Sequence, residues 1–352
     1  MQVRRRLLVW GGNVAEEQVW TVKATLDWCE GYLQRHGDSN PRLSAQWLLS
    51  EATGLSRIQL YANFQQPLSL EERAVLRDFV ARRGKGEPLQ YITGQVGFRY
   101  IMVKVRPGVL IPRPETEVLV SEALSLLPPA PRRVAGDSLL NEYEGAALMM
   151  AQPDQQGPAR AALAGEGGAA GDGTTDAPLL VADICTGSGC IACAMASERE
   201  DVRVIAGDIA EEAVALAREN VADLGLGDRV QVVKGDLGEA VEKGSPESWG
   251  NLDLVVSNPP YVPTQVMRQM PAEVTRFEPA LALDGGEDGL GIFRRLLVVC
   301  SQALKPGGAF AFELHEDCLD TAADEARKAG FSAVRVVYDL AGRPRVLTGR
   351  RA

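Results

Sequence analysis

The strongest constraint on the fold is a regular alternation of short apolar stretches and helix-patterned segments in the second half of the chain. Strands are predicted at residues 179–184, 202–207, 230–234, 252–257, 309–313 and 333–339. The segments between them have the length and apolar spacing of helices, as at 211–224. Strands that alternate with helices build a parallel sheet with helices on both faces. The sequence therefore predicts a doubly wound, Rossmann-like α/β domain.

A glycine-rich loop follows the first predicted strand. Residues 183–189 read Asp-Ile-Cys-Thr-Gly-Ser-Gly, and a helix is predicted directly afterwards. Glycines at this position let the backbone approach a ligand closely. The second strand ends at Asp208, whose carboxylate can accept hydrogen bonds from both hydroxyls of a ribose. These features predict a cofactor that carries a nucleoside, and by themselves they fit both S-adenosylmethionine and NAD.

The fourth predicted strand ends in the motif Asn258-Pro259-Pro260-Tyr261. Amide nitrogen is a poor nucleophile because its lone pair is delocalised into the carbonyl group. The side-chain carbonyl of Asn258 and the backbone carbonyl of Pro259 can each accept one N–H of an NH2 group, and the prolines keep both acceptors in place. Tyr261 offers a flat wall for a planar amide. The motif therefore predicts methyl transfer from S-adenosylmethionine to an amide nitrogen. An NAD-dependent dehydrogenase, the alternative that the glycine loop allows, would not explain this motif.

Two further residues complete the predicted cofactor site. The third strand is followed by Asp236 and Leu237, an acid and an apolar side chain that could flank an adenine. The catalytic and substrate-binding candidates are Asn258, Pro259, Pro260 and Tyr261. The cofactor-binding candidates are Asp183, Cys185, Thr186, Gly187, Ser188, Gly189, Asp208, Asp236, Leu237 and Asn258.

Three sequence blocks resemble the bacterial release factor glutamine methyltransferases, also called HemK or PrmC. The first two are Gly86-Glu87-Pro88-Leu89-Gln90-Tyr91-Ile92-Thr93-Gly94 and Pro107-Gly108-Val109-Leu110-Ile111-Pro112-Arg113-Pro114-Glu115-Thr116-Glu117. The third is Asn258-Pro259-Pro260-Tyr261-Val262, with Phe277-Glu278-Pro279 and Asp284-Gly285-Gly286-Glu287-Asp288-Gly289-Leu290 after it. The likeness covers roughly residues 21–127 and 179–347.

The resemblance implies a class I S-adenosylmethionine-dependent methyltransferase that acts on the side-chain amide nitrogen, N5, of a glutamine. In this family the glutamine belongs to the Gly-Gly-Gln motif of peptide chain release factors, so class I release factors are the expected partners. The family has a helical N-terminal domain that helps to hold the protein substrate, a hairpin linker and a catalytic domain. Arg113 and Glu115, in the second block, are expected to shape the site.

The element pattern fits this layout. Residues 1–18 are expected to be a ragged N-terminus, with a transit peptide as the alternative because Arg4, Arg5 and Arg6 precede a short apolar run. A helical domain is predicted over 19–87, a β-hairpin linker over 88–111 and the catalytic domain over 112–352, and Tyr91 and Ile92 are expected in the first of the short strands of the linker. Within the catalytic domain, residues 128–178 are rich in Gly, Ala and Pro and read as a mobile insertion.

Composition limits the partners and the compartment. The net charge is −10, which argues against stable nucleic acid binding through a basic surface. No apolar run approaches the length of a membrane span, so no membrane association and a cytoplasmic location are expected. Cysteines 185, 190 and 193 cluster, but no histidine lies nearby, so we interpret the six cysteines as small buried side chains and expect no metal.

Several alternatives and departures stay open. An adenine-N6 nucleic acid methyltransferase shares the Asn-Pro-Pro-Tyr motif, and a ribosomal-protein glutamine is a second conceivable substrate. A release-factor-binding protein without activity would not need both the cofactor acids and the amide clamp. Cys185 stands where the family often has glycine, and Leu314 and His315 stand where it usually has Ile-Gly. We expect His315 to be a partly exposed residue after a strand rather than a catalytic base.

Overall fold

The computed structural model describes residues 19–130, 177–267, 270 and 272–352. The chain divides between Thr93 and Gly94 into two compact units, and each is described by itself. The predicted N-terminal segment 1–18 lies outside the described residues, and so does residue range 131–176 of the predicted insertion.

The first unit is helical, and local capping explains where its helices begin. Ser56 and Gln59 form a capping box at one helix, and Ser69 and Glu72 form another. Gly54, at φ 70°, ends the second helix in the left-handed conformation that glycine tolerates. The helices bury an apolar core that includes Leu26, Leu48, Leu49, Leu60 and Leu76. Their bounds are α1 Val22–Arg35, α2 Pro41–Thr53, α3 Arg57–Ala62, α4 Leu70–Arg83 and α5 Leu89–Thr93.

Helix α5 corrects one prediction. Tyr91 and Ile92 were expected to begin the strands of the hairpin, but both lie in this short helix and are buried. Ile92 packs in the helical core, which gives these residues an apolar partner that the local β-propensity does not reveal. The hairpin itself comprises β1 Gln95–Phe98 and β2 Ile101–Lys104, paired antiparallel.

The hairpin is fixed to the second unit rather than free. Asn220 donates from Nδ2 to the Lys104 carbonyl (3.1 Å) and accepts from the Lys104 amide at Oδ1 (2.7 Å). Arg99, at the turn between the strands, forms an ion pair with Glu198. The hairpin, which the sequence analysis places in a linker, therefore belongs to the second unit.

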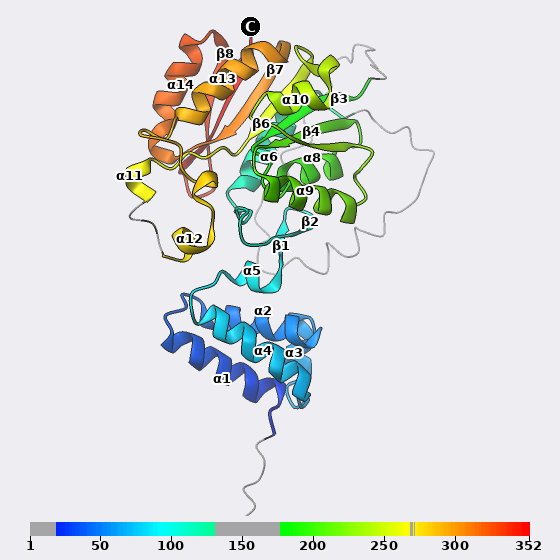
Figure 1. The fold of residues 1–352 in the computed structure, drawn as a ribbon, viewed down its shortest axis with the longest axis vertical. Coiled ribbons are helices and arrows are strands. Elements are labelled where there is room, and N and C mark those ends of the chain that lie inside the picture. Colours follow the sequence, from blue (N-terminus) through cyan, green and yellow to red (C-terminus); the bar gives the residue numbers. More distant parts are fainter. Residues whose placement is uncertain (1–18, 131–176, 268–269, 271) are drawn as a thin grey trace, which may run out of the picture. The chain divides into compact units, whose positions relative to one another are not determined.

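The second unit is built on a seven-stranded sheet in the order β5-β4-β3-β6-β7-β9-β8 in the described part of the chain (Figure 1). The strands β5, β4, β3, β6 and β7 run parallel to one another, and β9 lies antiparallel between β7 and β8. The strands are β3 Leu179–Ile184, β4 Val202–Asp208, β5 Val230–Lys234, β6 Leu252–Ser257, β7 Leu304–Glu313, β8 Phe331–Tyr338 and β9 Pro344–Arg351. The predicted Rossmann-like α/β fold is confirmed.

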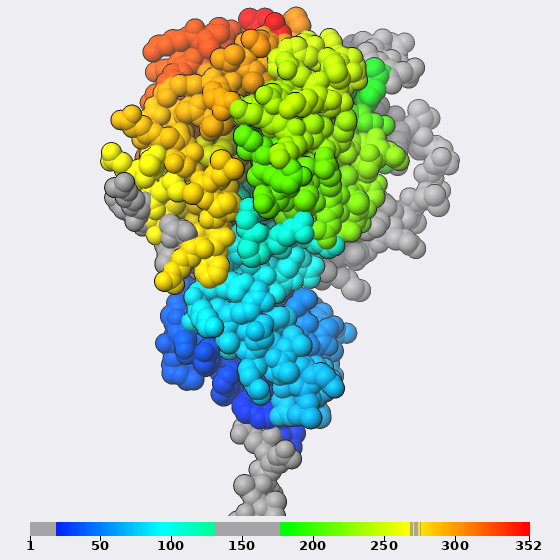
Figure 2. Space-filling model, viewed as in Figure 1, coloured from blue at the N-terminus to red at the C-terminus, as the bar shows by residue number. Residues whose placement is uncertain are grey.

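Helices cover both faces of this sheet. One apolar layer packs under α6, α8 and α9, and the other under α10, α13 and α14. In Figure 2 the green segment that follows β3 and the yellow-to-orange segment that follows β6 lie side by side on the face of the molecule that is in view. The helices are α6 Thr116–Leu126, α8 Cys190–Glu198, α9 Glu211–Asp223, α10 Glu239–Gly244, α11 Thr264–Met267, α12 Ala272–Phe277, α13 Gly291–Ala303 and α14 Leu319–Lys328. None of the described helices is long and apolar enough to cross a membrane.

The strand order places the predicted motifs together. Strand β3 lies between β4 and β6, so the direction in which the sheet grows reverses beside it. Ligands of doubly wound folds bind at such a point, outside the carboxyl ends of the strands. The glycine loop follows β3 and the Asn-Pro-Pro-Tyr motif follows β6, so the two motifs meet at this edge of the sheet.

Candidate active site

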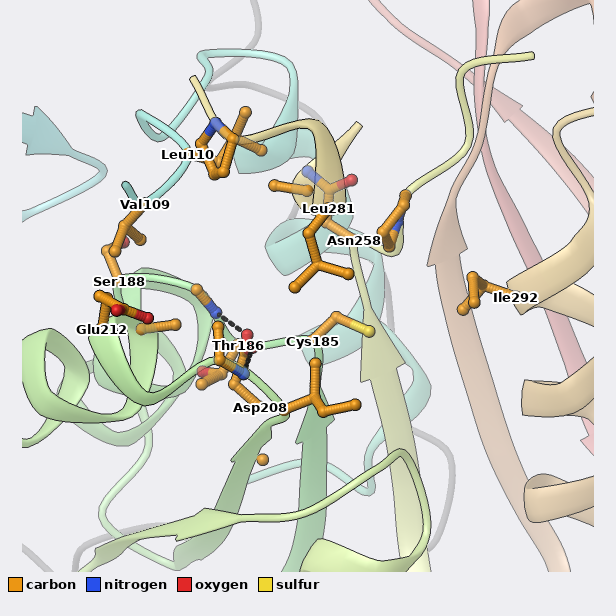
Figure 3. Close-up of a pocket in the computed structure, with 18 of the residues that line it drawn as sticks. Val109, Leu110, Cys185, Thr186, Ser188, Asp208, Glu212, Asn258, Leu281 and Ile292 are labelled. Atoms are coloured by element: carbon orange, nitrogen blue, oxygen red, sulfur yellow. Dashed lines mark hydrogen bonds between the residues drawn. The ribbon is translucent and has the colours of Figure 1, made fainter. Parts of the chain in front are cut away.

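A cavity of about 310 Å³ opens at the carboxyl ends of the parallel strands. Its walls come from the loops after β3, β4, β5 and β6, from the segment before α6, and from residues after α12. Figure 3 shows Val109, Thr186, Asp208, Asn258 and Leu281 around this space. Of the predicted site residues, the cavity is lined by Arg113, Cys185, Thr186, Gly187, Ser188, Asp208, Asp236, Leu237, Asn258 and Pro260. Asp183, Gly189, Glu115, Pro259 and Tyr261 do not line it.

Asp183 lies beneath the glycine loop and is fully buried. Its Oδ2 accepts hydrogen bonds from the Thr186 hydroxyl (2.6 Å) and from the Ala192 amide (3.1 Å), which join the loop to α8. Its Oδ1 has no hydrogen-bond partner among the described residues. Burial, only partly offset by these hydrogen bonds, raises the pKa of Asp183 to about 7. Asp183 was expected to bind the cofactor, but it is placed to shape the loop.

The loop needs unusual backbone conformations. Gly187 and Gly189 have φ values of 56° and 80°, and Cys185 has φ 62° although it is not a glycine. A Cβ on Gly189 would lie 3.1 Å from the Cβ of Ala217, so α8 and α9 approach closely there. Gly189 therefore acts in helix packing, whereas Gly187 faces the cavity. Burial raises the pKa of the Cys185 thiol, which keeps the cavity wall neutral at this point.

Asp208 ends β4 and faces the cavity. Its Oδ2 accepts from the Gly187 amide (2.9 Å), and its Oδ1 accepts from the Ala210 amide (3.0 Å), as the dashed lines in Figure 3 mark. Burial raises the pKa of this carboxyl, and the backbone hydrogen bonds partly offset that effect. Each oxygen of a carboxylate can accept more than one hydrogen bond, so Asp208 retains capacity for a ligand hydroxyl.

Asp236 and Leu237 follow β5, and the structure assigns them different surroundings. Leu237 is buried with φ 49°, and it lines the cavity. The Asp236 carboxylate lies 2.6 Å from Nη2 of Arg295, a residue of α13 that also lines the cavity. The turn therefore offers an apolar surface beside an ion pair.

These residues fit S-adenosylmethionine. A volume of about 310 Å³ lies in the range of small-molecule sites. Asp208 can hold ribose hydroxyls, Leu237 and Ile209 give apolar surface, and the backbone at Gly187 can approach a ligand without a side chain in the way. The described residues contain no group of three or more His, Cys, Asp or Glu side chains suited to a metal ion.

Asn258 follows β6 and reaches toward α6. Its Nδ2 donates a hydrogen bond to the hydroxyl of Thr116, the first residue of α6, at 3.1 Å. Among the described residues no hydrogen bond to Asn258 Oδ1 or to the Pro259 carbonyl is found. Because the amino end of the Asn258 amide is occupied, its carbonyl oxygen is the end that is left to accept.

Tyr261, which the sequence predicts as a flat wall for the substrate amide, does not line the cofactor cavity. Its hydroxyl donates to Oε1 of Glu313, the last residue of β7, at 3.0 Å. The next residue, Val262, pairs with the segment around Asp284 through two backbone hydrogen bonds, from Val262 to Leu283 (2.8 Å) and from Gly285 to Val262 (2.9 Å). A Cβ on Gly285 would lie 2.7 Å from the Cα of Tyr261, which explains a glycine in that block.

An ion pair links two of the sequence blocks across the cavity. Nη2 of Arg113 lies 2.6 and 2.7 Å from the two carboxylate oxygens of Glu278, whose side chain is buried. Arg113, Pro279 and Leu281 all line the cavity, so the pair fixes one wall against another. Glu115 precedes α6 at its N-cap position without a side-chain cap and lies outside the lining.

Sequence reasoning did not assign roles to Thr116, Glu278 or Glu313. Thr116 and Glu278 lie inside blocks that carry the family resemblance, which is the signal that could have identified them. Nothing local distinguishes Glu313, because its role depends on which strands are neighbours. His315 is partly exposed, and its Nδ1 accepts from the Asp317 amide at the start of a 3-10 turn. The six cysteines are free, and five of them are buried.

Two family models match the chain. One is described as the PrmC N-terminal domain, over residues 24–94, and the other as the methyltransferase small domain, over residues 175–276. Together with the sheet order and the glycine loop, they define a class I S-adenosylmethionine-dependent methyltransferase.

Full-length relatives are more specific. The chain is 37% identical to the release factor glutamine methyltransferase of Geobacter sulfurreducens, over 95% of this chain and 98% of that protein. It is 35% identical to the enzyme of the same name from Caulobacter vibrioides, over 90% and 92% of the two chains. The corresponding values for Rhodopirellula baltica are 33% identity over 97% and 99%. The chain belongs to the release factor glutamine methyltransferase family.

Proposed function

We propose that this enzyme methylates the side-chain amide nitrogen of the glutamine in the Gly-Gly-Gln motif of class I peptide chain release factors. Family membership supports a release factor glutamine as the substrate. The observation that carries the proposal is the hydrogen bond from Asn258 to Thr116, because it leaves an amide-accepting carbonyl beside the cofactor cavity.

The chain's residues account for the two requirements of this reaction. The substrate amide must be held so that its lone pair faces the methyl donor, and Asn258 Oδ1 with the Pro259 carbonyl can each accept one N–H. These acceptors are oriented before the substrate arrives, because α6 holds Asn258 and the two prolines restrict the loop. S-adenosylmethionine supplies an activated methyl group that already carries its leaving group. The amide nitrogen loses one proton, which water or a neighbouring acceptor can take, so no strong base is required.

We assign the cofactor to the loops after β3, β4 and β5. The backbone at Gly187 and the Asp208 carboxylate would hold the ribose side, and Leu237 with Ile209 would contact the base. Thr186 and Ser188 belong to the loop after β3, Cys185 lies at the start of that loop, and all three residues line the cavity. Asp183 and Gly189 would act indirectly, through the shape of the loop and the packing of α8.

The experiment uses the full-length enzyme, labelled S-adenosylmethionine and purified class I release factors. The methyl group is mapped by mass spectrometry, and a release factor with Gly-Gly-Glu in place of Gly-Gly-Gln is the control. Methylation confined to the Gly-Gly-Gln glutamine is the expected result. Transfer to a ribosomal protein or to adenine in DNA, with none to release factors, would contradict the proposal. The cytoplasmic location and the lack of stable nucleic acid binding stay predictions.

A further inference from the structure

Glu313 is a buried carboxylate at the end of β7 for which the reaction described above has no role. Its side chain is almost fully buried, and no ion pair to it is found among the described residues. Tyr261 donates to Oε1, whereas Oε2 has no hydrogen-bond partner of standard geometry in the described part of the chain. Burying an unpaired carboxylate costs free energy, so a residue of this kind beside an active site calls for a function.

Thr116 lies between this carboxylate and Asn258. Its hydroxyl oxygen accepts from Asn258 Nδ2 at 3.1 Å, and the same hydroxyl interacts with the Glu313 carboxyl and lowers its pKa, which means that it favours the charged form. A hydroxyl has one proton to donate, and an ionised carboxylate can only accept. When the Thr116 hydroxyl donates its hydrogen bond to Glu313, its oxygen can only accept from Asn258. Asn258 must then present its NH2 group to Thr116.

We propose that Glu313 is a positioning residue that fixes the direction of the hydrogen-bond chain from Asn258 through Thr116, and so turns the Asn258 carbonyl toward the substrate amide. This inference rests on the proposed function, because it explains how the amide acceptor is oriented. Without a fixed acceptor at its far end, Thr116 could donate to Asn258 instead. The Asn258 amide would then turn over and present two donors to the substrate, which also carries donors.

The same carboxylate holds the other polar residue of the motif. The Tyr261 hydroxyl donates to Glu313 Oε1, so both Asn258 and Tyr261 depend on one acceptor. The groups that act on Glu313 are Thr116 and Tyr261 by hydrogen bonding, Glu115 by repulsion and Arg345 by attraction. Burial is the largest influence and raises the pKa of Glu313 above that of an exposed glutamate.

The inference predicts a pH dependence with a definite sign. Protonated Glu313 can donate to Thr116, and the direction of the chain is then lost. Turnover should therefore rise with pH as Glu313 ionises and fall as it is protonated. Glu313→Gln keeps the shape of the side chain but adds hydrogen-bond donors, so the turnover of this variant should be low. Its pH profile should lack the step that ionisation of Glu313 produces.

The test compares Glu313→Gln with wild type in steady-state methylation of a class I release factor from pH 5.5 to 8.5. We expect kcat to fall roughly 10–100-fold, the scale known for outer residues that orient reacting groups. The cofactor Kd and the release factor KM should change less than about twofold, because Glu313 does not line the cavity. Glu325→Gln, which alters a surface ion pair with Arg294, is the control for the same chemical change.

Thr116 variants keep the inference testable if Glu313→Gln fails to fold. Thr116→Val removes the hydroxyl and should reproduce the fall in kcat. Thr116→Ser keeps a hydroxyl and should therefore keep most of the wild-type kcat. The double variant Thr116→Val/Glu313→Gln should be no slower than the worse single variant, because both break one chain. Wild-type kcat and pH profile in Glu313→Gln or in Thr116→Val would overturn the inference. No methylation of release factors by the wild-type enzyme would instead refute the proposed function.

Discussion

Arg113 and Glu278 stand 165 residues apart in the sequence and meet as an ion pair, with Nη2 of Arg113 2.6 and 2.7 Å from the two carboxylate oxygens. Glu278 is buried, while Arg113 is about one-third exposed at the cavity. The pair connects the segment before α6 with the segment after α12, and both segments line the cofactor cavity. It therefore determines the shape of the cavity as well as the position of two loops.

Loss of Arg113 should weaken both the fold and the cofactor site. Arg113→Met removes one ion-pair partner of the buried Glu278 carboxylate, and we expect about 1–2 kcal/mol of lost stability, less than for a fully buried pair because Arg113 is partly solvated. The cofactor Kd should rise roughly tenfold as the wall loosens. Urea unfolding and calorimetry measure the two effects. Lys243→Met, which removes an exposed pair with Glu239, is the matched control, and equal behaviour of the two variants would refute this role.

Asp208 should contribute to cofactor affinity directly. Asp208→Ala removes the acceptor at the end of β4, and a charge-assisted hydrogen bond is typically worth ~1.5–3 kcal/mol, so the Kd should rise roughly 10–150-fold. Because Asp208 also accepts from Gly187 and Ala210, Asp208→Asn, which keeps one acceptor, should show a smaller loss. Calorimetry with S-adenosylmethionine checks this, with the exposed Asp228→Ala as control. Unchanged affinity in Asp208→Ala would remove this residue from the site.

Asn258 should matter for turnover more than for binding. Asn258→Ala is expected to lower kcat roughly 10²–10³-fold, the scale for losing one preorganised polar group at a reacting centre, with cofactor affinity nearly intact. Asn258→Asp keeps an acceptor but loses the donor to Thr116, so partial activity is expected. Single-turnover methylation of a release factor separates the chemical step from product release. A wild-type rate in Asn258→Ala would contradict the proposed clamp.

Asp183 should make stability depend on pH near neutrality. Its pKa is about 7 in the folded enzyme, above its ordinary value of 3.8, so the folded state binds the proton more tightly than the unfolded chain. A group with a raised folded pKa contributes stability below its unfolded pKa and loses that contribution as pH rises through the folded pKa.

Asp183→Asn, which cannot ionise, should therefore gain stability relative to wild type between pH 4 and pH 7.5, by an amount on the order of 1–3 kcal/mol. The comparison is a series of urea unfolding curves for both proteins. Other groups with a raised pKa that do not act on Asp183, such as Glu313, are present in both proteins and cancel in the difference. A constant difference across this pH range would show that folding does not change the protonation state of Asp183 there.

The family and the main motifs could be predicted because they are local in the sequence. The glycine loop, Asp208 and Asn258 each stand at the end of a strand whose apolar pattern is unambiguous, and parallel strands bring such ends to one edge. The helix at 89–93 was misassigned as strand because Tyr91 and Ile92 have β-propensity, and only their packing in the helical unit decided otherwise. Cys185 illustrates a departure that the fold accommodates, since its thiol is small and its φ of 62° is held by the loop.

The sequence by itself determined the fold class, the family and the two motifs that meet at the cavity, because strand and helix periodicity and short motifs are properties of neighbouring residues. The tertiary structure alone decided which side chains act on one another. Thr116 reaches Asn258, Tyr261 reaches Glu313 and Arg113 reaches Glu278 only after α6, β6 and β7 have packed together. Such contacts join residues far apart in the chain, and their energies depend on burial and direction, which no local pattern encodes.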